Sequence, residues 1–262
     1  MNQRPDPGQP ADPTGMSTPS GQTGIPVKFT PPGRPAYVSY VLLGLTALIF
    51  AGQLIIEYFT GTDWLAFYGM KVNPLIQAGE YWRLLTPVLL HSSLMHAAFN
   101  LYALFAFGPA LEAHYGHGRF LALYLLSAFA GNVTSYFMTT SPSLGASTAL
   151  FGLIAAEAVF IYRNRAMFGI RAAPMLAQIG FVIVFNLFLG FTPGARTDNW
   201  GHLGGLLGGL VIAWTAGPLW ALVRRETYLE LKDTNGWRQM ITSAVVVVVL
   251  FSAAVLVRRG LP

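Results

Sequence analysis

Long apolar segments alternate with short polar connections along most of the chain. A helix needs about 20 mostly apolar residues to cross the hydrocarbon core of a bilayer, and seven segments approach that length, the fourth being the shortest. We therefore predict membrane-spanning helices at residues 36–57, 84–108, 119–139, 147–162, 172–191, 200–223 and 240–257. This pattern indicates an all-α fold, a polytopic helical bundle in a membrane.

The first 34 residues have a different character. They are rich in Pro, Gly, Ser and Thr and contain little that a core could bury, which is typical of a disordered tail. They also lack the short apolar core of a secretory signal peptide, so we expect the first span to be retained in the mature protein.

The composition supports a membrane protein. Hydrophobic residues make up 53% of the chain and charged residues only 10%, whereas about 25% of residues are charged in a typical soluble domain. The net charge of +5 is spread between the apolar segments, so we expect no nucleic acid as a partner. The absence of cysteine excludes disulfides and thiolate metal sites.

The distribution of lysine and arginine predicts the orientation. Cytoplasmic connections carry an excess of these residues, which favours a cytoplasmic N-terminus and places the connection before Ser147 on the outer side. Arg258 and Arg259, which follow the last span, oppose this rule. The basic residues that support the orientation are Lys28, Arg34, Arg163, Arg165, Arg171, Arg224, Arg225, Lys232 and Arg238.

Polar side chains are few within the predicted spans, and they gather toward the outer ends. They are His91, His96 and Asn100 in the second span, Ser147 in the fourth and His202 in the sixth. Polar groups at membrane depth are costly and indicate function. On a helix His96 and Asn100 share a face, but His91 lies roughly 140° from His96, which disfavours a metal site that uses both histidines. A serine together with a histidine instead favours acyl transfer, in which they act as nucleophile and general base.

Each of these residues has a simpler explanation when it is taken alone. A serine at a helix start is more often an N-cap than a nucleophile, and a membrane histidine often only hydrogen-bonds a neighbouring helix. The glycines of the sixth span form a close-packing face, and that face would let His202 approach Ser147. The small residues concerned are Gly201, Gly204, Gly205, Gly208 and Gly209 in the sixth span and Gly152, Ala155 and Ala156 in the fourth.

Four sequence stretches together resemble the rhomboid family of intramembrane serine proteases. They are "GEYWRLLTPVLLHSSLMHAAFN", "FGPALEAHYGHGRFLALYLLSAFAGN", "GASTALFG" and "GHLGGLLGG". The resemblance implies that Ser147 is the nucleophile and His202 its general base, a dyad without a carboxylate. It also implies that His96, Asn100 and the backbone N–H of Ser147 form the oxyanion hole.

The resemblance implies supporting roles for further residues. Phe151 would pack on the base, and His91 would line the cavity of the active site. Gly145 belongs to the serine motif "GASTALFG", and Gly205 belongs to the histidine motif "GHLGGLLGG". Trp82 and Arg83 would lie in a structured first external loop. Glu112 would be structural. The chain departs from the family at Thr148, where glycine is common, and at Trp200 and Gly201 before the histidine.

The family layout divides the chain into three parts. Residues 1–34 would form a disordered cytoplasmic tail, residues 35–225 a six-span protease core, and residues 226–262 a linker and an extra C-terminal transmembrane helix. The implied function is an intramembrane serine endopeptidase. For a chain this short a bacterial plasma membrane is the simplest expectation, and an organelle membrane is the alternative. The protease would cut transmembrane protein substrates near the outer face of the lipid bilayer without a cofactor or metal.

Two other functions fit a polytopic chain. A catalytically silent relative would bind or escort transmembrane clients, but the presence of both Ser147 and His202 argues against it. A transporter should show corresponding broken helices in two halves of the chain, and the sequence contains no such repeat.

Overall fold

The computed structural model describes residues 27–28, 35–192, 197–224 and 228–259. Apart from β1 (Val27–Lys28), the predicted tail lies outside the described residues, as do Arg34, Arg225 and the predicted boundary between residues 225 and 226. The described part is dominated by long helices, which confirms the predicted polytopic helical membrane bundle. The long helices are α1 (Tyr37–Thr60), α4 (Leu94–Tyr115), α5 (His117–Met138), α6 (Ser147–Arg163), α8 (Ala172–Gly190), α9 (Asn199–Ala216) and α10 (Trp237–Arg259).

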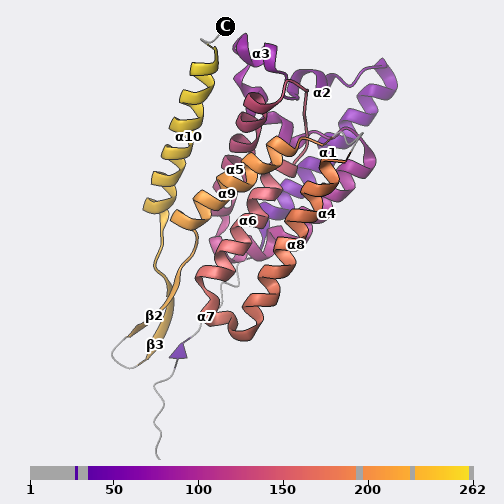
Figure 1. Cartoon of the computed structure of the whole chain (residues 1–262). Coiled ribbons are helices and arrows are strands. Elements are labelled where there is room, and N and C mark those ends of the chain that lie inside the picture. Colours follow the sequence, from indigo (N-terminus) through magenta and orange to yellow (C-terminus); the bar gives the residue numbers. More distant parts are fainter. Residues whose placement is uncertain (1–26, 29–34, 193–196, 225–227, 260–262) are drawn as a thin grey trace, which may run out of the picture.

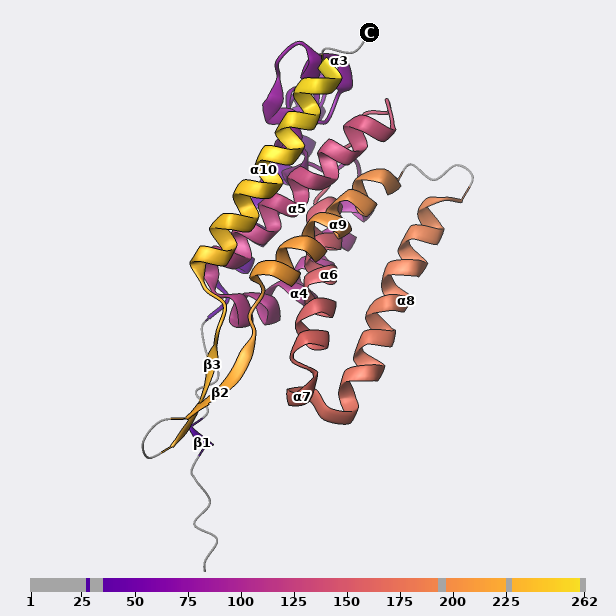
Figure 2. The ribbon, with the colours of Figure 1, turned by 60° about the vertical axis from the view of Figure 1, so that its left-hand side comes forward.

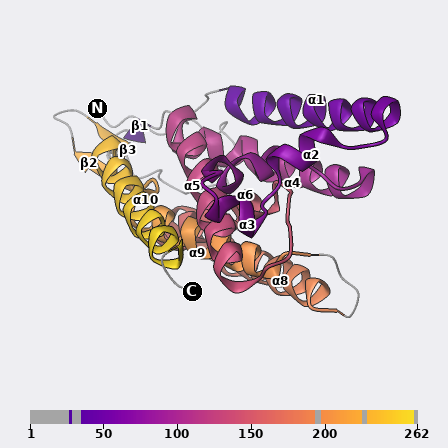
Figure 3. The same ribbon diagram turned by 90° about the horizontal axis from the view of Figure 1, so that it is seen from above.

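Five stretches of the described residues are long and apolar enough to cross a membrane. They contain α1, α4, α5, α8 and α10. The remaining long helices, α6 and α9, are shorter or richer in glycine, and they pack against each other and against α5. Figure 3 shows α1 and α10 on opposite sides of this central group. The two helices that carry Ser147 and His202 are therefore enclosed largely by protein.

Two predicted spans have the wrong bounds. The second helix begins at Leu94, because residues 81–89 form the 3-10 turns η1 (Tyr81–Leu84) and η2 (Thr86–Leu89), and the Ser93 hydroxyl then caps α4. The sixth helix ends at Ala216, where Gly217 takes an extended conformation. Apolar composition alone does not distinguish an irregular or extended segment from a helix.

The connection between α1 and α4 is an ordered structure at the end of the bundle where Ser147 lies. It contains α2 (Trp64–Gly69) and α3 (Asn73–Gln77). The buried guanidinium of Arg83 donates to the carbonyls of Phe67 and Met70 and pairs with Glu80. Glu112 lies inside α4 rather than after it, and its carboxylate accepts from the backbone N–H groups at the start of α1.

The opposite end of the bundle carries a small sheet that the sequence did not predict. Strands β2 (Trp220–Arg224) and β3 (Leu229–Asp233) are antiparallel, and β1 pairs with β3 in parallel. This sheet and the short helix α7 (Arg165–Phe168) lie at the same end, whereas α3 and the last turns of α10 lie at the other (Figures 1 and 2). The described basic residues of the two predicted cytoplasmic connections therefore share one end of the molecule.

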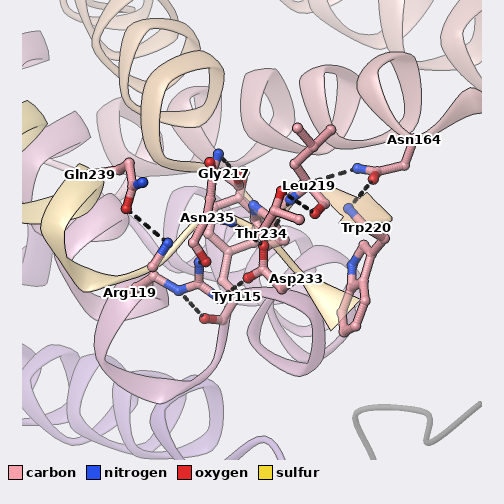
Figure 4. Close-up of polar contacts among 12 residues, drawn as sticks. Tyr115, Arg119, Asn164, Gly217, Leu219, Trp220, Asp233, Thr234, Asn235 and Gln239 are labelled. Atoms are coloured by element: carbon pink, nitrogen blue, oxygen red, sulfur yellow. Dashed lines mark hydrogen bonds and ion pairs between the residues drawn. The ribbon is translucent and has the colours of Figure 1, made fainter. Parts of the chain in front are cut away.

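An ion pair joins the sheet to the core at this end. The Arg119 guanidinium, near the start of α5, lies 2.6 Å from the Asp233 carboxylate and also donates to the Tyr115 carbonyl (Figure 4). Asn235 then donates to the Gly217 carbonyl. At the far end of α10, Arg258 donates to the Phe137 carbonyl and lies over the rings of Tyr136 and Phe137. Arg258 therefore has partners on α5 at the end opposite the basic cluster.

Candidate active site

Ser147 and His202 are brought together by the contact between α6 and α9. Ser147 is the first residue of α6, and its Oγ lies 2.8 Å from His202 Nε2. The interpretation of Ser147 as an N-cap does not fit, because Ala146 occupies the cap position of α6 and no side chain caps that helix. Asp198 caps α9 through the Gly201 N–H, so His202 lies in the first turns of its helix.

Glycine makes this approach possible. A Cβ atom at Gly205, one turn after His202, would collide with the carbonyl group of Thr148, and a Cβ atom at Gly209 would collide with the backbone of Gly152. Main chains can touch in this way only where both helices lack bulk at the contact. The predicted glycine face therefore packs on α6, and Gly204 and Gly208 of the same helix face α5.

The His202 ring is held by an aromatic stack. The ring of Phe151, one turn after Ser147, lies 4.3 Å from the His202 ring at an interplanar angle of 15°. His202 Nδ1 is buried and has no hydrogen-bond partner among the described residues. Packing, rather than a carboxylate, therefore orients the imidazole in the described part of the chain.

His96 and Gly145 frame a small space beside Ser147. Gly145 has φ +134°, a conformation that side chains rarely adopt. A Cβ atom there would lie 2.7 Å from His96 Nε2 and 3.6 Å from Ser147 Oγ. The space that glycine leaves open is therefore bordered by an imidazole nitrogen and by the hydroxyl. Asn100 is buried one turn after His96 and donates one amide N–H to the His96 carbonyl.

His91 lies behind this space. It precedes α4, so the helical spacing of 140° from His96 does not apply, and the two rings meet edge to face at 5.1 Å. His91 Nε2 accepts from the Ala146 N–H at 3.5 Å, and Gln53 binds both backbone groups of His91. His91 thus contacts both His96 and the segment that leads into Ser147.

Thr148 faces away from the hydroxyl and the imidazole. It is buried, and its side chain fills the space beside Gly131 of α5 and Gly201 of α9. Its hydroxyl has no hydrogen-bond partner among the described residues. The departure from the family motif at Thr148 therefore serves the packing of three helices, and the departure at Gly201 provides the matching gap.

A family model for the Rhomboid domain matches residues 78–219, more than half of the chain. The chain belongs to the rhomboid family. The matched rhomboid domain includes Ser147, His202, His96 and Asn100, whereas α1 and α10 lie outside it.

Several named rhomboid proteins are similar to this chain. "Rhomboid protease GluP" of Bacillus subtilis (strain 168) is 40% identical over 185 residues, which cover 71% of this chain and 36% of that protein. "RHOMBOID-like protein 9, chloroplastic" of Arabidopsis thaliana is 37% identical, covering 58% and 35%. "Rhomboid-like protease 1" of Toxoplasma gondii is 37% identical, covering 56% and 51%. The chain spans between a third and about half of the length of these relatives.

The structure adds polar residues around the site that sequence reasoning did not select. Lys71, Ser135 and Asp198 form a connected group, in which the Lys71 ammonium lies 3.0 Å from Ser135 Oγ and the Ser135 hydroxyl donates to the Asp198 carboxylate. Asp198 has a recognisable signal, an acidic residue at the start of a glycine-rich helix. Lys71 has no local signal, because its partners lie more than 60 residues away in the sequence.

Proposed function

We propose that this protein is an intramembrane serine endopeptidase that cleaves transmembrane segments of membrane proteins near the outer face. The observation that carries the proposal is the 2.8 Å contact between Ser147 Oγ and His202 Nε2, with the imidazole stacked on Phe151. A hydroxyl that meets an imidazole nitrogen within hydrogen-bond distance is the arrangement needed for nucleophilic catalysis.

The reaction proceeds in two halves. Neutral His202 takes the proton of Ser147 as Oγ attacks the carbonyl carbon of the scissile bond. His202 then gives that proton to the leaving nitrogen, and an acyl-enzyme remains on Ser147. In the second half His202 takes a proton from a water molecule as the water oxygen attacks the acyl carbon. The bond between that carbon and Ser147 Oγ then breaks, and the proton returns from His202 to Oγ.

The developing oxyanion needs donors placed before the reaction begins. The space beside Gly145 suits this role, because His96 Nε2 and Ser147 Oγ border it, and we infer that the backbone N–H of Ser147 is a further donor. The Asn100 amide has a second N–H beyond the one given to His96. Loss of one such donor typically lowers kcat by about 10²- to 10³-fold, so His96→Ala and Asn100→Ala should leave measurable activity.

The substrate is a transmembrane helix with a weak segment near the outer end. A scissile carbonyl inside an intact helix is hydrogen-bonded and shielded by side chains, so the substrate must unwind before Ser147 reaches it. Glycine weakens a helix by about 1 kcal/mol and proline by about 3 kcal/mol. Segments with Gly, Pro or small residues near the membrane surface are therefore the preferred targets.

The orientation follows from the basic residues. Arg163, Arg165 and Arg171 lie at the α7 end of the bundle, with Arg224 and Lys232 in the sheet at that same end. The excess of arginine and lysine assigns this end to the cytoplasm, and Ser147 then faces the outer side. A bacterial plasma membrane is the location that fits the similarity to the Bacillus subtilis protease.

The test is cleavage of a model transmembrane substrate by the purified protein in liposomes. Wild type should cleave, whereas Ser147→Ala and His202→Ala should not. A fluorophosphonate probe should label wild type and should fail to label Ser147→Ala. Equal cleavage by wild type and Ser147→Ala would refute the proposal. A folded wild type that binds the substrate without cutting it would instead favour a silent protein that escorts transmembrane clients.

A further inference from the structure

We propose that Lys71 is a positioning residue for the Ser147–His202 pair, because it ties the segment that leads into Ser147 to the cap of the helix that carries His202. This inference rests on the proposed function. Lys71 lies between α2 and α3, outside the membrane-spanning helices, and its side chain is fully buried.

The first connection of Lys71 runs to the nucleophile. Its ammonium donates to the carbonyls of Thr139 and Ser141 at 3.2 and 2.9 Å. Its backbone forms a two-way bridge with Ser143, in which each residue donates its N–H to the carbonyl of the other. Residues 139–146 link α5 to Ser147, so Lys71 fixes the path of the chain into the first turn of α6.

The second connection runs to the general base. The Lys71 ammonium lies 3.0 Å from Ser135 Oγ, and the Ser135 hydroxyl donates to one oxygen of Asp198. The other Asp198 oxygen accepts from the Gly201 N–H, and the Asp198 carbonyl accepts from the N–H of His202. The position of the first turn of α9 therefore depends on Ser135, and Ser135 is held by Lys71.

The ammonium is suited to this junction in its charged form. It has three N–H donors for acceptors in two elements, whereas a neutral amine has two donors and no charge. The acceptors include carbonyls at the C-terminal end of α5, where the helix dipole favours a cation. The loss of one proton therefore weakens the connection to residues 139–146 or the connection to Ser135.

The charge of Lys71 is poised near neutral pH. Burial lowers its pKa from 10.5 to about 8, the Asp198 carboxylate opposes this shift, and the Arg258 guanidinium adds to it. These are the charged groups that face Lys71 from α9 and α10, and α5 and residues 139–146 face it with neutral groups in the described part of the chain. Figure 1 shows the ends of α5 and α10 beside α3, the helix that follows Lys71.

Activity and stability then respond to pH in opposite directions. As the pH rises through about 8, Lys71 loses its proton in the folded protein and cleavage should slow. The unfolded chain keeps that proton up to its higher pKa, so this group makes the folded state more stable, not less, between about pH 8 and 10.5. Alkaline inactivation caused by unfolding would show falling stability instead.

The experiment compares wild type, Lys71→Met and a matched control, Arg119→Met. Arg119 also binds a helix-terminal carbonyl, but at the end of α5 farthest from Ser147. The substrate is chosen so that no titratable residue lies near the cut. The measurements, made between about pH 6 and 10, are kcat, KM, fluorophosphonate labelling of Ser147 and the melting temperature. For Lys71→Met we expect kcat about 10- to 100-fold lower at pH 7, KM within about twofold, and no alkaline decline near pH 8.

A second variant tests the same inference while every contact of the Lys71 ammonium stays in place, although Arg258 itself donates to the Phe137 carbonyl at the end of α5. Arg258→Met removes the cation that helps to lower the Lys71 pKa, so the alkaline decline should move to higher pH. Arg119→Met should keep the wild-type pH profile whatever it does to stability. The inference would be overturned if Lys71→Met kept the wild-type kcat and pH profile. If Lys71→Met does not fold, it would be overturned by an Arg258→Met variant whose activity declines at the same alkaline pH as wild type. A wild type that neither cleaves nor labels would overturn the proposed function instead.

Discussion

Gly205→Ala tests the contact that brings the hydroxyl to the imidazole. The added Cβ would lie 2.8 Å from the carbonyl carbon of Thr148, whereas carbon atoms pack at about 3.5–4.0 Å. The two main chains must therefore separate by about 1 Å. Gly205 lies one turn after His202, so the same displacement lengthens the 2.8 Å hydrogen bond to Ser147 beyond its useful range.

This substitution should lower both the unfolding free energy and the rate of reaction at Ser147. Overpacking of this kind costs about 1–3 kcal/mol of unfolding free energy, and a misplacement of about 1 Å in an active site lowers the rate by about 10²-fold. The assays are thermal unfolding in detergent and the rate of fluorophosphonate labelling at Ser147. Labelling reports the chemistry of the dyad independently of substrate binding.

A matched control separates the contact from a general effect of alanine. Gly44 lies in α1 and is exposed, and a Cβ atom added there would meet nothing within 4 Å beyond the backbone of its own helix. Gly44→Ala should leave labelling unchanged and should be neutral or slightly stabilising, because alanine favours helix by up to about 1 kcal/mol over glycine. Wild-type labelling and stability in Gly205→Ala would show that the two helices do not touch as described.

Three further substitutions have defined outcomes. Phe151→Ala removes the stack on His202, an interaction worth about 0.5–1.5 kcal/mol. Because this interaction holds the imidazole in its orientation, kcat should fall by about 3- to 10-fold at constant KM; an unchanged kcat would mean that the ring is held by other contacts. Thr148→Val keeps the shape but removes a buried hydroxyl without a partner among the described residues, so stability and cleavage should be equal to or above wild type, and a large loss would reveal a hidden partner. Glu112→Gln weakens the cap on the start of α1 and should lower the unfolding free energy by about 1–3 kcal/mol, measured by thermal unfolding, while cleavage per folded molecule stays at the wild-type level.

The sequence predicted best what depends on local pattern. The helix from Ser147 was placed correctly because small and apolar residues run almost without interruption from the serine to Arg163. The contact between the fourth and sixth spans followed from the spacing of glycines, which the sequence alone shows. His202 and Ser147 then meet as a geometric consequence of that spacing.

What depends on distant partners was not predictable in this way. Residues 84–93 are apolar enough to resemble a helix, but Pro87 and the Ser93 cap divide them from α4. The strand at Trp220–Arg224 is defined by pairing with β3 rather than by its own residues. The role of Lys71 depends on acceptors in α5 and in the segment before Ser147, which only the folded chain brings near.

Gly205 and Gly209 of α9 lie against the backbone of α6, and this contact, the glycine seam, sets how closely the two helices approach. Where main chain touches main chain, the separation of the two helices is set by atoms that every residue has in common, so substitutions of exposed side chains on other helices should have little effect on it. Among the described residues, the glycine contacts between α6 and α9 involve no side chain of α8 or α10. Substitutions on the exposed sides of those outer helices should therefore leave the Ser147–His202 distance unchanged. The glycine seam thus fixes the geometry of the site independently of the exposed surfaces of the surrounding helices.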